Sequence, residues 1–145
     1  RLRLAYAEAG GTVVPEYNTT ADLKTLMLAP YPLKLSRDRV TDENSPVTFL
    51  APEHPALNSP NKITSTDFEG WVQERGLYFP NEWDAKFTPL LAMHDPDGKP
   101  TSGALLVVRH GQGWYVYTGL SFFRELPDGV PGAYRLLANL VSLGH

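Results

Sequence analysis

The stretch "GALLVVRHGQGWYVYTGL", residues 103–120, decides the fold of this chain. Two apolar runs rich in β-branched and aromatic residues, 103–108 and 113–120, flank the glycine-containing segment "RHGQ". This pattern predicts a β-hairpin. Because both runs are almost continuously apolar, we expect the hairpin to be buried on both of its faces.

A helix is predicted soon after the hairpin. In the segment "AYRLLANLVSL", residues 133–143, apolar side chains recur at the spacing of one helix face. Pro131 suits the first turn of this helix and Gly144 suits its C-terminal stop. We expect the helix to cover the sheet with one set of side chains: Ala133, Leu136, Leu137, Leu140 and Val141.

The N-terminal part predicts the first half of a β-α-β unit. A helical pattern over residues 1–9 ends at the pair Gly10 and Gly11, and "TVVPEYN" (12–18) follows as a short strand. Pro15 restricts this strand to an edge, a strand end or a bulge. The sum is a three-layer α/β arrangement with a mixed sheet, in one domain spanning residues 1–145.

The middle of the chain is rich in proline and predicts short elements. Residues 38–46 are expected to form a polar turn region, and residues 47–52 a short strand. Residues 52–63 are expected to hold turns and at most one helical turn, because Pro55 and Pro60 prevent a longer helix.

Residues 70–87, "GWVQERGLYFPNEWDAKF", permit two interpretations. In the first, a helical turn capped by Ser65 or Thr66 precedes a short strand at 76–79, and the aromatic residues fasten a long segment across the sheet. In the second, the segment binds a sugar, because Trp71 and Trp83 are each flanked by two acidic residues. Sugar rings stack on aromatic faces while carboxylates bind their hydroxyls.

Composition excludes several classes of function. The formal net charge of -3 gives no basic surplus for phosphates, so no nucleic-acid partner is expected. No apolar run approaches 18 residues, so no membrane span is expected, and the compartment stays open. The absence of cysteine excludes disulfides, thiolate metal sites and a cysteine nucleophile.

The candidate catalytic and metal-binding residues are few. None of the four histidines has metal-ligand spacing: His54, His94, His110 and His145. His94 with Asp95 and Asp97, in "HDPDG", is interpreted as a turn instead of a cation site. Ser121, in "TGLSFF", follows a strand as a nucleophile elbow would, but Phe123 occupies the position that requires glycine.

Several blocks resemble one family in the same order along the chain. They are "GGTVV", "APYPLKLSRDRVT", "NKITSTDFEGWVQERGLYFP", "WDAKFTPLLAMHDP" and the whole segment from "GALLVV" to "LANLVSL". Together they resemble the C-terminal region of large bacterial LmbE-like, or PIG-L-like, deacetylases. The resemblance implies a class I glutamine amidotransferase-like (ThuA-like) domain with a flavodoxin-like sheet. Since the chain begins inside a helical pattern at Arg1, we expect a partial domain at the C-terminal end of a longer protein.

The resemblance also implies where chemistry would be found. Zinc and deacetylation of N-acetylglucosamine-type substrates belong to an N-terminal domain with an "HPDDE"-like motif, which this sequence lacks. Active amidotransferases need a cysteine and a histidine after a late strand. Here there is no cysteine, and the late strand continues into "YTGLSFF". A triad without its base cannot activate a nucleophile. We therefore expect a non-catalytic accessory domain that holds no cofactor and contacts the catalytic domain of its parent chain, or a glycan.

Candidate contact residues and one alternative follow from this interpretation. Arg124 joins the candidates because it follows the buried strand, at the sheet end where open α/β sheets bind ligands. The alternative is an amidotransferase-like or ThuA-like hydrolase of a sugar-related substrate, using Glu74 or Glu82 together with His94. The candidate ligand or interdomain contacts are Trp71, Glu74, Arg75, Trp83 and Arg124.

Overall fold

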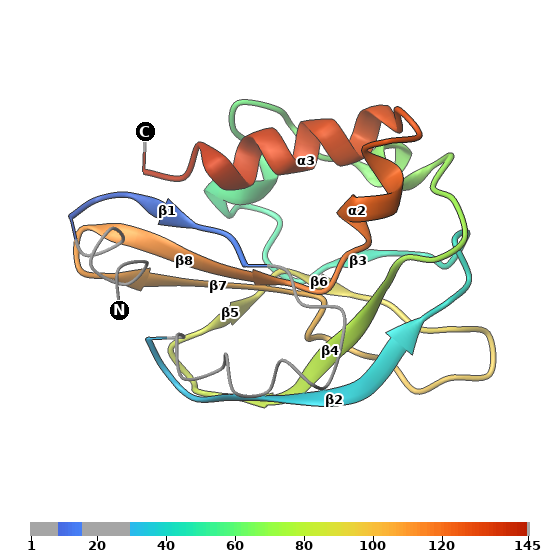
Figure 1. The fold of residues 1–145 in the computed structure, drawn as a ribbon, viewed down its shortest axis with the longest axis horizontal. Coiled ribbons are helices and arrows are strands. Elements are labelled where there is room, and N and C mark those ends of the chain that lie inside the picture. Colours follow the sequence, from blue (N-terminus) through green and yellow to red (C-terminus); the bar gives the residue numbers. More distant parts are fainter. Residues whose placement is uncertain (1–8, 16–29, 145) are drawn as a thin grey trace.

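The computed structural model describes residues 9–15 and 30–144. These residues form a small α/β domain with a mixed sheet and two helices. A four-stranded sheet, in the order β1-β8-β7-β5, lies in the middle. Figure 1 shows α2 and α3 on one face of this sheet and the two-stranded ribbon of β2 and β4 on the other. The predicted α/β arrangement with a mixed sheet is confirmed.

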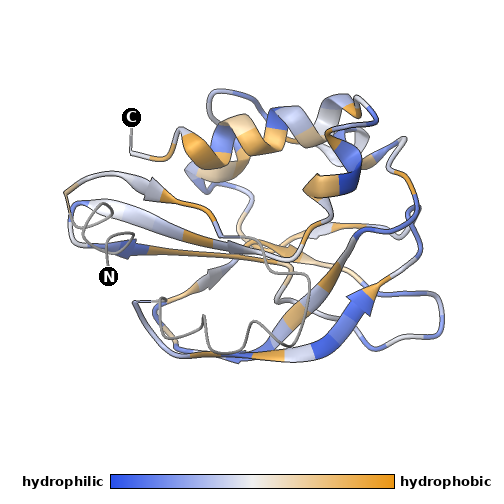
Figure 2. Ribbon diagram, viewed as in Figure 1, coloured by the Kyte–Doolittle hydropathy of each residue, from blue (hydrophilic) through white to orange (hydrophobic). Residues whose placement is uncertain are grey.

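The predicted hairpin forms the centre of the sheet. β7 (Leu105–His110) pairs antiparallel with β8 (Gly113–Thr118), and the turn is shorter than expected because Arg109 and His110 belong to β7. Alternate side chains enter two separate clusters, one under the helices and one under the ribbon. Val107 and Val116 belong to the first cluster, whereas Leu106 and Tyr117 belong to the second. Burial on both faces is therefore confirmed, and Figure 2 shows the hydrophobic course of β7.

Short strands complete the sheet. β1 (Thr12–Val13) runs parallel to β8 as an edge strand, which confirms the prediction from Pro15, and β5 (Thr88–Pro89) pairs antiparallel with β7. A separate pair, β3 (Thr48–Phe49) and β6 (Leu91–Ala92), confirms the strand predicted at 47–52. The helical pattern over 1–9 lies almost wholly outside the described residues.

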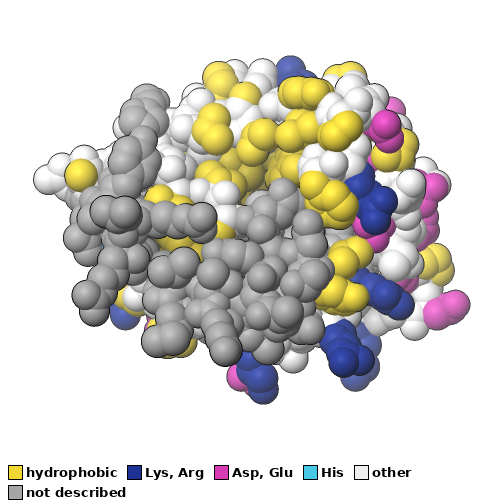
Figure 3. Space-filling model, in the orientation of Figure 1, with side chains coloured by type: hydrophobic (Ala, Val, Ile, Leu, Met, Phe, Trp, Pro, Cys, Tyr) yellow, Lys and Arg dark blue, Asp and Glu magenta, His cyan; other side chains and the backbone are white. Residues whose placement is uncertain are grey.

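The long strand β2 was not predicted. β2 (Leu33–Val40) pairs antiparallel with β4 (Gly76–Trp83), so the expectation of a turn over 38–46 is wrong for its first three residues. The alternation of β2 explains its place, because Leu33 and Leu35 are buried while exposed side chains lie between and beyond them. Figure 3 shows basic side chains along the lower edge of the molecule, where β2 runs; its exposed basic residues are Lys34, Arg37 and Arg39.

Glycines let the ribbon approach the sheet. The Leu77 N–H donates to Gly119 O at 3.0 Å, and a Cβ on Gly76 would lie only 2.2 Å from that same oxygen. A Cβ on Gly103 would lie 2.1 Å from Pro80 O. Only glycine permits such backbone contact. The start of β4 is thereby fixed against the end of β8, where the candidate site begins.

The helical elements largely match the sequence. α3 (Pro131–Val141) begins with Pro131 in its first turn, and Ala133, Leu136 and Leu140 are buried against the sheet. Val141 is 53% exposed, so its predicted place in the covering face is wrong: the buried positions are Ala133, Leu136, Leu140 and Leu143, and Val141 lies outside the face that they form. The short helix α2 (Phe122–Glu125) follows β8 directly.

Two 3-10 turns pack against α3. The turn Pro55–Leu57 confirms the one helical turn expected in this proline-rich part. The turn Ser65–Phe68 confirms the turn before Trp71, but its cap is Thr64, whose N–H donates to the Asp67 carboxylate at 2.9 Å. The predicted caps lie one and two residues too late, because Asp67 reaches back three residues from inside the turn.

Asn139 of α3 holds the proline-rich segment in place. Its side chain is fully buried and donates to Ala56 O (3.0 Å) and Asn61 O (2.7 Å), while its Oδ1 accepts from the Asn61 N–H (2.9 Å). We expect Asn139→Ala to lower the free energy of unfolding by roughly 2–4 kcal/mol, because it leaves buried backbone groups without partners. Urea unfolding followed by circular dichroism measures this change.

The control is Asn81→Ala, at an exposed position of β4. We expect it to change the unfolding free energy by less than about 0.5 kcal/mol. Equal stability of Asn139→Ala and the unaltered chain would contradict this role of the buried amide.

Candidate functional site

The candidate site lies where β8 ends, the segment 72–76 passes and α2 begins. Ser121 stands between β8 and α2 and is fully buried. Its backbone N–H donates to Arg75 O at 2.9 Å. Its Oγ lies near three oxygens: Glu74 O at 2.9 Å, Arg75 O at 3.1 Å and Glu125 Oε2 at 2.9 Å. The serine follows β8, precedes α2 and joins three segments.

The oxygens around Ser121 Oγ outnumber its single hydrogen. A hydroxyl carries one hydrogen, so it cannot donate to two backbone carbonyls and to a carboxylate at once. The arrangement is satisfied when Glu125 is protonated: its carboxyl then donates to Ser121 Oγ, and the hydroxyl donates to a carbonyl of Glu74 or Arg75. The other carboxyl oxygen, Glu125 Oε1, accepts from the Val72 N–H at 2.5 Å. The geometry therefore favours a neutral carboxyl group.

The surroundings of Glu125 agree with this assignment. Burial raises the pKa of Glu125, and the nearby negative charges of Asp128 and Glu74 raise it further. The bond from the Val72 N–H, and a bond from the Ser121 hydroxyl to the ionised carboxylate, act in the opposite direction, because they stabilise the anion. Glu125 is fully buried, and desolvation outweighs these two hydrogen bonds.

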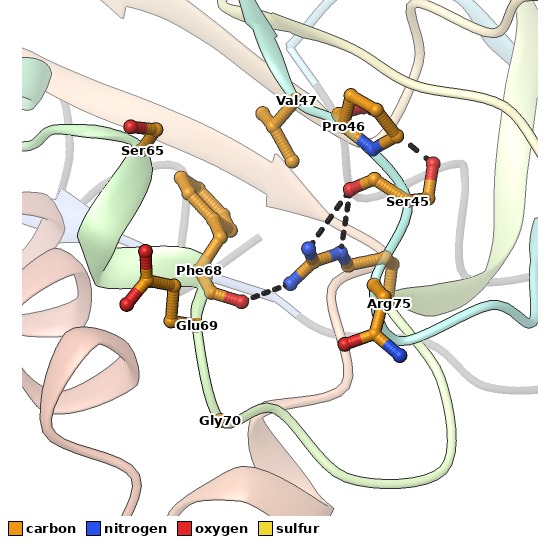
Figure 4. A pocket seen from close by; sticks show the side chains of 9 residues that line it. Ser45, Pro46, Val47, Ser65, Phe68, Glu69, Gly70 and Arg75 are labelled. Atoms are coloured by element: carbon orange, nitrogen blue, oxygen red, sulfur yellow. Dashed lines mark hydrogen bonds between the residues drawn. The ribbon is translucent and has the colours of Figure 1, made fainter.

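Arg75 ties two loops to the start of β4. Its side chain is 4% exposed, and its Nε and Nη2 donate to Ser45 O at 3.1 and 2.8 Å. Its Nη1 donates to Phe68 O, as Figure 4 shows. The guanidinium also lies 5.6 Å from the ring centre of Phe68 and 5.8 Å from that of Trp71. Burial lowers the pKa of Arg75, while the charges of Asp42, Glu125 and Glu43 act to raise it.

Four of the five predicted contact residues come together here. Trp71 is buried, donates from Nε1 to Asp67 O at 2.9 Å and stacks on Phe68. The Glu74 carboxylate accepts from Arg124 Nε at 2.7 Å, and Arg124 also donates to the Gln73 side chain. Because the Arg124 side chain is 40% exposed, this ion pair contributes little to stability.

Trp83 lies elsewhere. It ends β4 opposite Leu33 and packs partly buried against the cluster on the ribbon side. It borders a shallow pocket with Glu82, one of the acids proposed for the alternative hydrolase. The structure thus separates Trp83 from the other four candidates. The burial of Trp71 leaves its ring no open face for a sugar.

The histidines lie outside this cluster. The His94 ring is exposed and lies 2.8 Å from its neighbour's carbonyl, Asp95 O, within a turn closed by Gly98 N–H to Asp95 O. The carboxylate of Asp95 binds the N–H groups of Thr41 and Asp42 at 2.8 Å, so it serves as a turn acceptor.

The other histidines also have packing roles or fall outside the structure. The His54 ring lies against Trp114 at 5.6 Å and accepts from the Ala56 N–H. Burial lowers the pKa of His54. The His110 ring lies edge-on to Tyr31 at 6.2 Å. His145 is outside the described residues.

The described residues, 9–15 and 30–144, contain neither a metal-binding cluster nor a membrane-spanning helix. No group of three or more His, Cys, Asp or Glu side chains is placed to hold a metal ion. No helix in this part of the chain is long and apolar enough to cross a membrane.

Sequence reasoning missed Glu125 and Ser45. Glu125 is seven residues after the end of β8, and its sequence context is typical of an acid in an exposed turn. Only its position four residues after Ser121 indicated a bond within one helical turn. Ser45 contributes a backbone carbonyl to Arg75, and a carbonyl leaves no trace in the sequence. Comparison with known proteins gives no family that matches the chain and no curated protein that matches it.

A pH-dependent contribution to stability follows from Glu125. A carboxyl group whose pKa is raised on folding stabilises the fold fully below its unfolded pKa of about 4.3. That contribution is then lost as the pH rises through the folded pKa. We expect the unaltered chain to lose stability relative to Glu125→Gln across this range, by at most about 1.4 kcal/mol per pH unit. Thermal unfolding of both proteins from pH 4 to pH 8 measures the difference.

Glu53→Gln, which removes an exposed carboxyl group, is the matched control. The stability difference between Glu53→Gln and the unaltered chain should not show this dependence on pH. A stability difference for Glu125→Gln that is constant with pH, or that changes in the opposite direction, would refute the protonated carboxyl group.

Proposed function

We propose that this chain is a non-catalytic accessory domain of a larger LmbE-like, N-acetylglucosaminyl deacetylase-type protein. In this proposal its α/β fold is of the flavodoxin-like, class I glutamine amidotransferase-like type. The zinc chemistry would lie in a separate catalytic domain of the same parent chain. The role of the present domain would be to contact that catalytic domain or to hold a carbohydrate.

The proposal depends on the burial of the residues that follow β8. In an active amidotransferase-like enzyme this region would supply a histidine that faces substrate. Here Ser121 is fully buried and its hydroxyl is engaged with Glu125 and two backbone carbonyls. Phe122, the next residue, is buried as well. A group enclosed in this way cannot reach a substrate carbonyl, and the sequence has no cysteine to act as nucleophile.

The polar residues around this junction support a contact role. Gln73 and Arg124 are exposed, and Arg124 with Glu74 forms a fixed ion pair at the surface. The exposed Arg124 of this pair offers a partner a charged group that Glu74 holds in position. Phe123, 41% exposed, lies under the Arg124 guanidinium at 5.0 Å and adds apolar area to the same patch.

The proposal predicts that the purified chain binds less than about 0.1 zinc per molecule after dialysis and hydrolyses no N-acetylglucosamine-type substrate. It also predicts that the chain binds a separately produced zinc domain encoded upstream in the same reading frame. Metal content by mass spectrometry, acetate release and calorimetry measure these properties. Phe123→Ala combined with Arg124→Ala should weaken the binding at least tenfold. Stoichiometric zinc, or acetate release by this chain, would refute the proposal.

The alternative, a hydrolase of a sugar-related substrate, places Glu74 or Glu82 with His94 in catalysis. The same acetate-release assay tests it. If activity is found, His94→Ala and Glu74→Gln should each reduce it at least 100-fold under this alternative. Activity that is unaffected by both changes would exclude these residues.

A further inference from the structure

The most informative feature outside the proposed contact patch is a pocket beside Arg75. It has a volume of about 240 Å³ and lies between the loop 44–47 and the turn 65–70. Figure 4 shows Val47, Ser65 and Phe68 around it and the Arg75 guanidinium at one side. Its lining thus combines one cation with hydroxyl groups and apolar surface.

Arg75 has donors left for a ligand. A guanidinium carries five N–H groups, and three of them are used: Nε–H and one Nη2–H toward Ser45 O, and one Nη1–H toward Phe68 O. One N–H therefore remains on each terminal nitrogen. Each of these two N–H groups can donate to a ligand oxygen.

The positive charge of Arg75 also lacks a bonded counter-charge. Among the described residues the carboxylates paired with arginines at hydrogen-bond distance are Glu74, with Arg124, and Asp67, with Arg135. No carboxylate of this part of the chain lies within 4.0 Å of the Arg75 guanidinium. A cation that is only 4% exposed is ordinarily paired, because burial without a partner costs several kcal/mol.

The surrounding acids limit the charge of a suitable ligand. Asp42 and Glu43 act on Arg75 from a distance, and both would repel a dianion such as phosphate. Glu69 also lines the pocket, and Figure 4 shows its carboxylate turned away from the guanidinium. A hydroxyl or amino group of the ligand could donate to Glu69 while a carboxylate met Arg75.

A larger cavity adjoins the pocket. Val47 and Ser65 also border a second cavity of about 490 Å³, which Phe49, Leu57 and Lys62 line further along. The two cavities therefore share part of their walls.

We infer that this pocket binds a small organic carboxylate that carries hydroxyl or amino groups, with its carboxylate on Arg75 and its donors toward Glu69. Sugar acids and hydroxy acids have this chemistry. The inference does not rest on the proposed accessory role, since the pocket would bind such a ligand whether or not the domain belongs to a deacetylase.

Titration of the ¹⁵N-labelled chain with D-glucuronate tests the inference, with glucose and inorganic phosphate as comparison probes at constant ionic strength and pH. Glucuronate should give saturable shifts of the backbone amides of Ser45, Val47, Phe68 and Gly70, and of the Arg75 Nε–H. Glucose and phosphate should each bind at least tenfold more weakly. Equal binding of glucose, or tighter binding of phosphate, would overturn the inference.

A pair of neighbouring variants locates the site without altering Arg75, whose replacement endangers folding because it joins two loops. Ser65 is exposed and lines the pocket, whereas the next residue, Thr66, is exposed and does not. Ser65→Trp should weaken glucuronate binding at least tenfold, and Thr66→Trp should leave it within about twofold. Both proteins should keep the spectrum of the folded chain. Unchanged affinity in Ser65→Trp would show that glucuronate binds elsewhere and would overturn the inference.

Discussion

The buried hydrogen bonds around Ser121 are the constraint on which the arrangement of this domain depends. One hydroxyl group connects the end of β8, the segment before β4 and the first turn of α2. The contact is possible because Gly76 and Gly119 allow the two backbones to approach without side chains between them. The ribbon on one face of the sheet and the helices on the other are thereby held to the same point. The central hairpin contributes to this arrangement by ending where Ser121 can form these hydrogen bonds.

The segment 72–76 serves both the fold and the candidate site. The carbonyls of Glu74 and Arg75 face Ser121, while their side chains point to separate partners, Arg124 for one and the carbonyls of Ser45 and Phe68 for the other. A left-handed residue, Gln73 with φ of 67°, precedes them and turns the chain so that these groups can face different sides. Replacing the side chain of Glu74 or Arg75 therefore changes stability as well as any binding. Variants of exposed residues that line the pocket beside Arg75, such as Ser65, separate the two effects.

The central layer could be predicted from sequence, and the polar junction could not. β7 and β8 are buried on both faces, and this burial produces a continuous apolar run in each strand. α3 is buried on one face, and this burial produces the helical spacing of Ala133, Leu136 and Leu140. β2 escaped because its polar half, from Arg37 to Arg39, reads as a turn until β4 is known to pair with it.

In the candidate site, too, some features could be predicted from the sequence and others could not. The composition of residues 70–87 indicated Trp71, Glu74 and Arg75 because a charged, aromatic segment is unusual, and the structure brings these residues together with Arg124. It could not indicate which of them would be buried. The burial of Arg75 depends on carbonyls contributed from 30 and 7 residues away, and such partners carry no side-chain signal. Trp83 had the same composition around it but lies on the other side of the sheet, because β4 crosses between the two clusters.

The protonated Glu125 and the pocket at Arg75 are electrostatically connected. The charge of Glu125 is among those that stabilise the charged form of Arg75. When Glu125 is neutral, one of these compensating charges is absent. The attraction of Arg75 for an external carboxylate is then stronger than it would be beside an ionised Glu125. A proton on Glu125 thus leaves the Arg75 guanidinium with one compensating charge fewer, and a bound carboxylate would replace that charge.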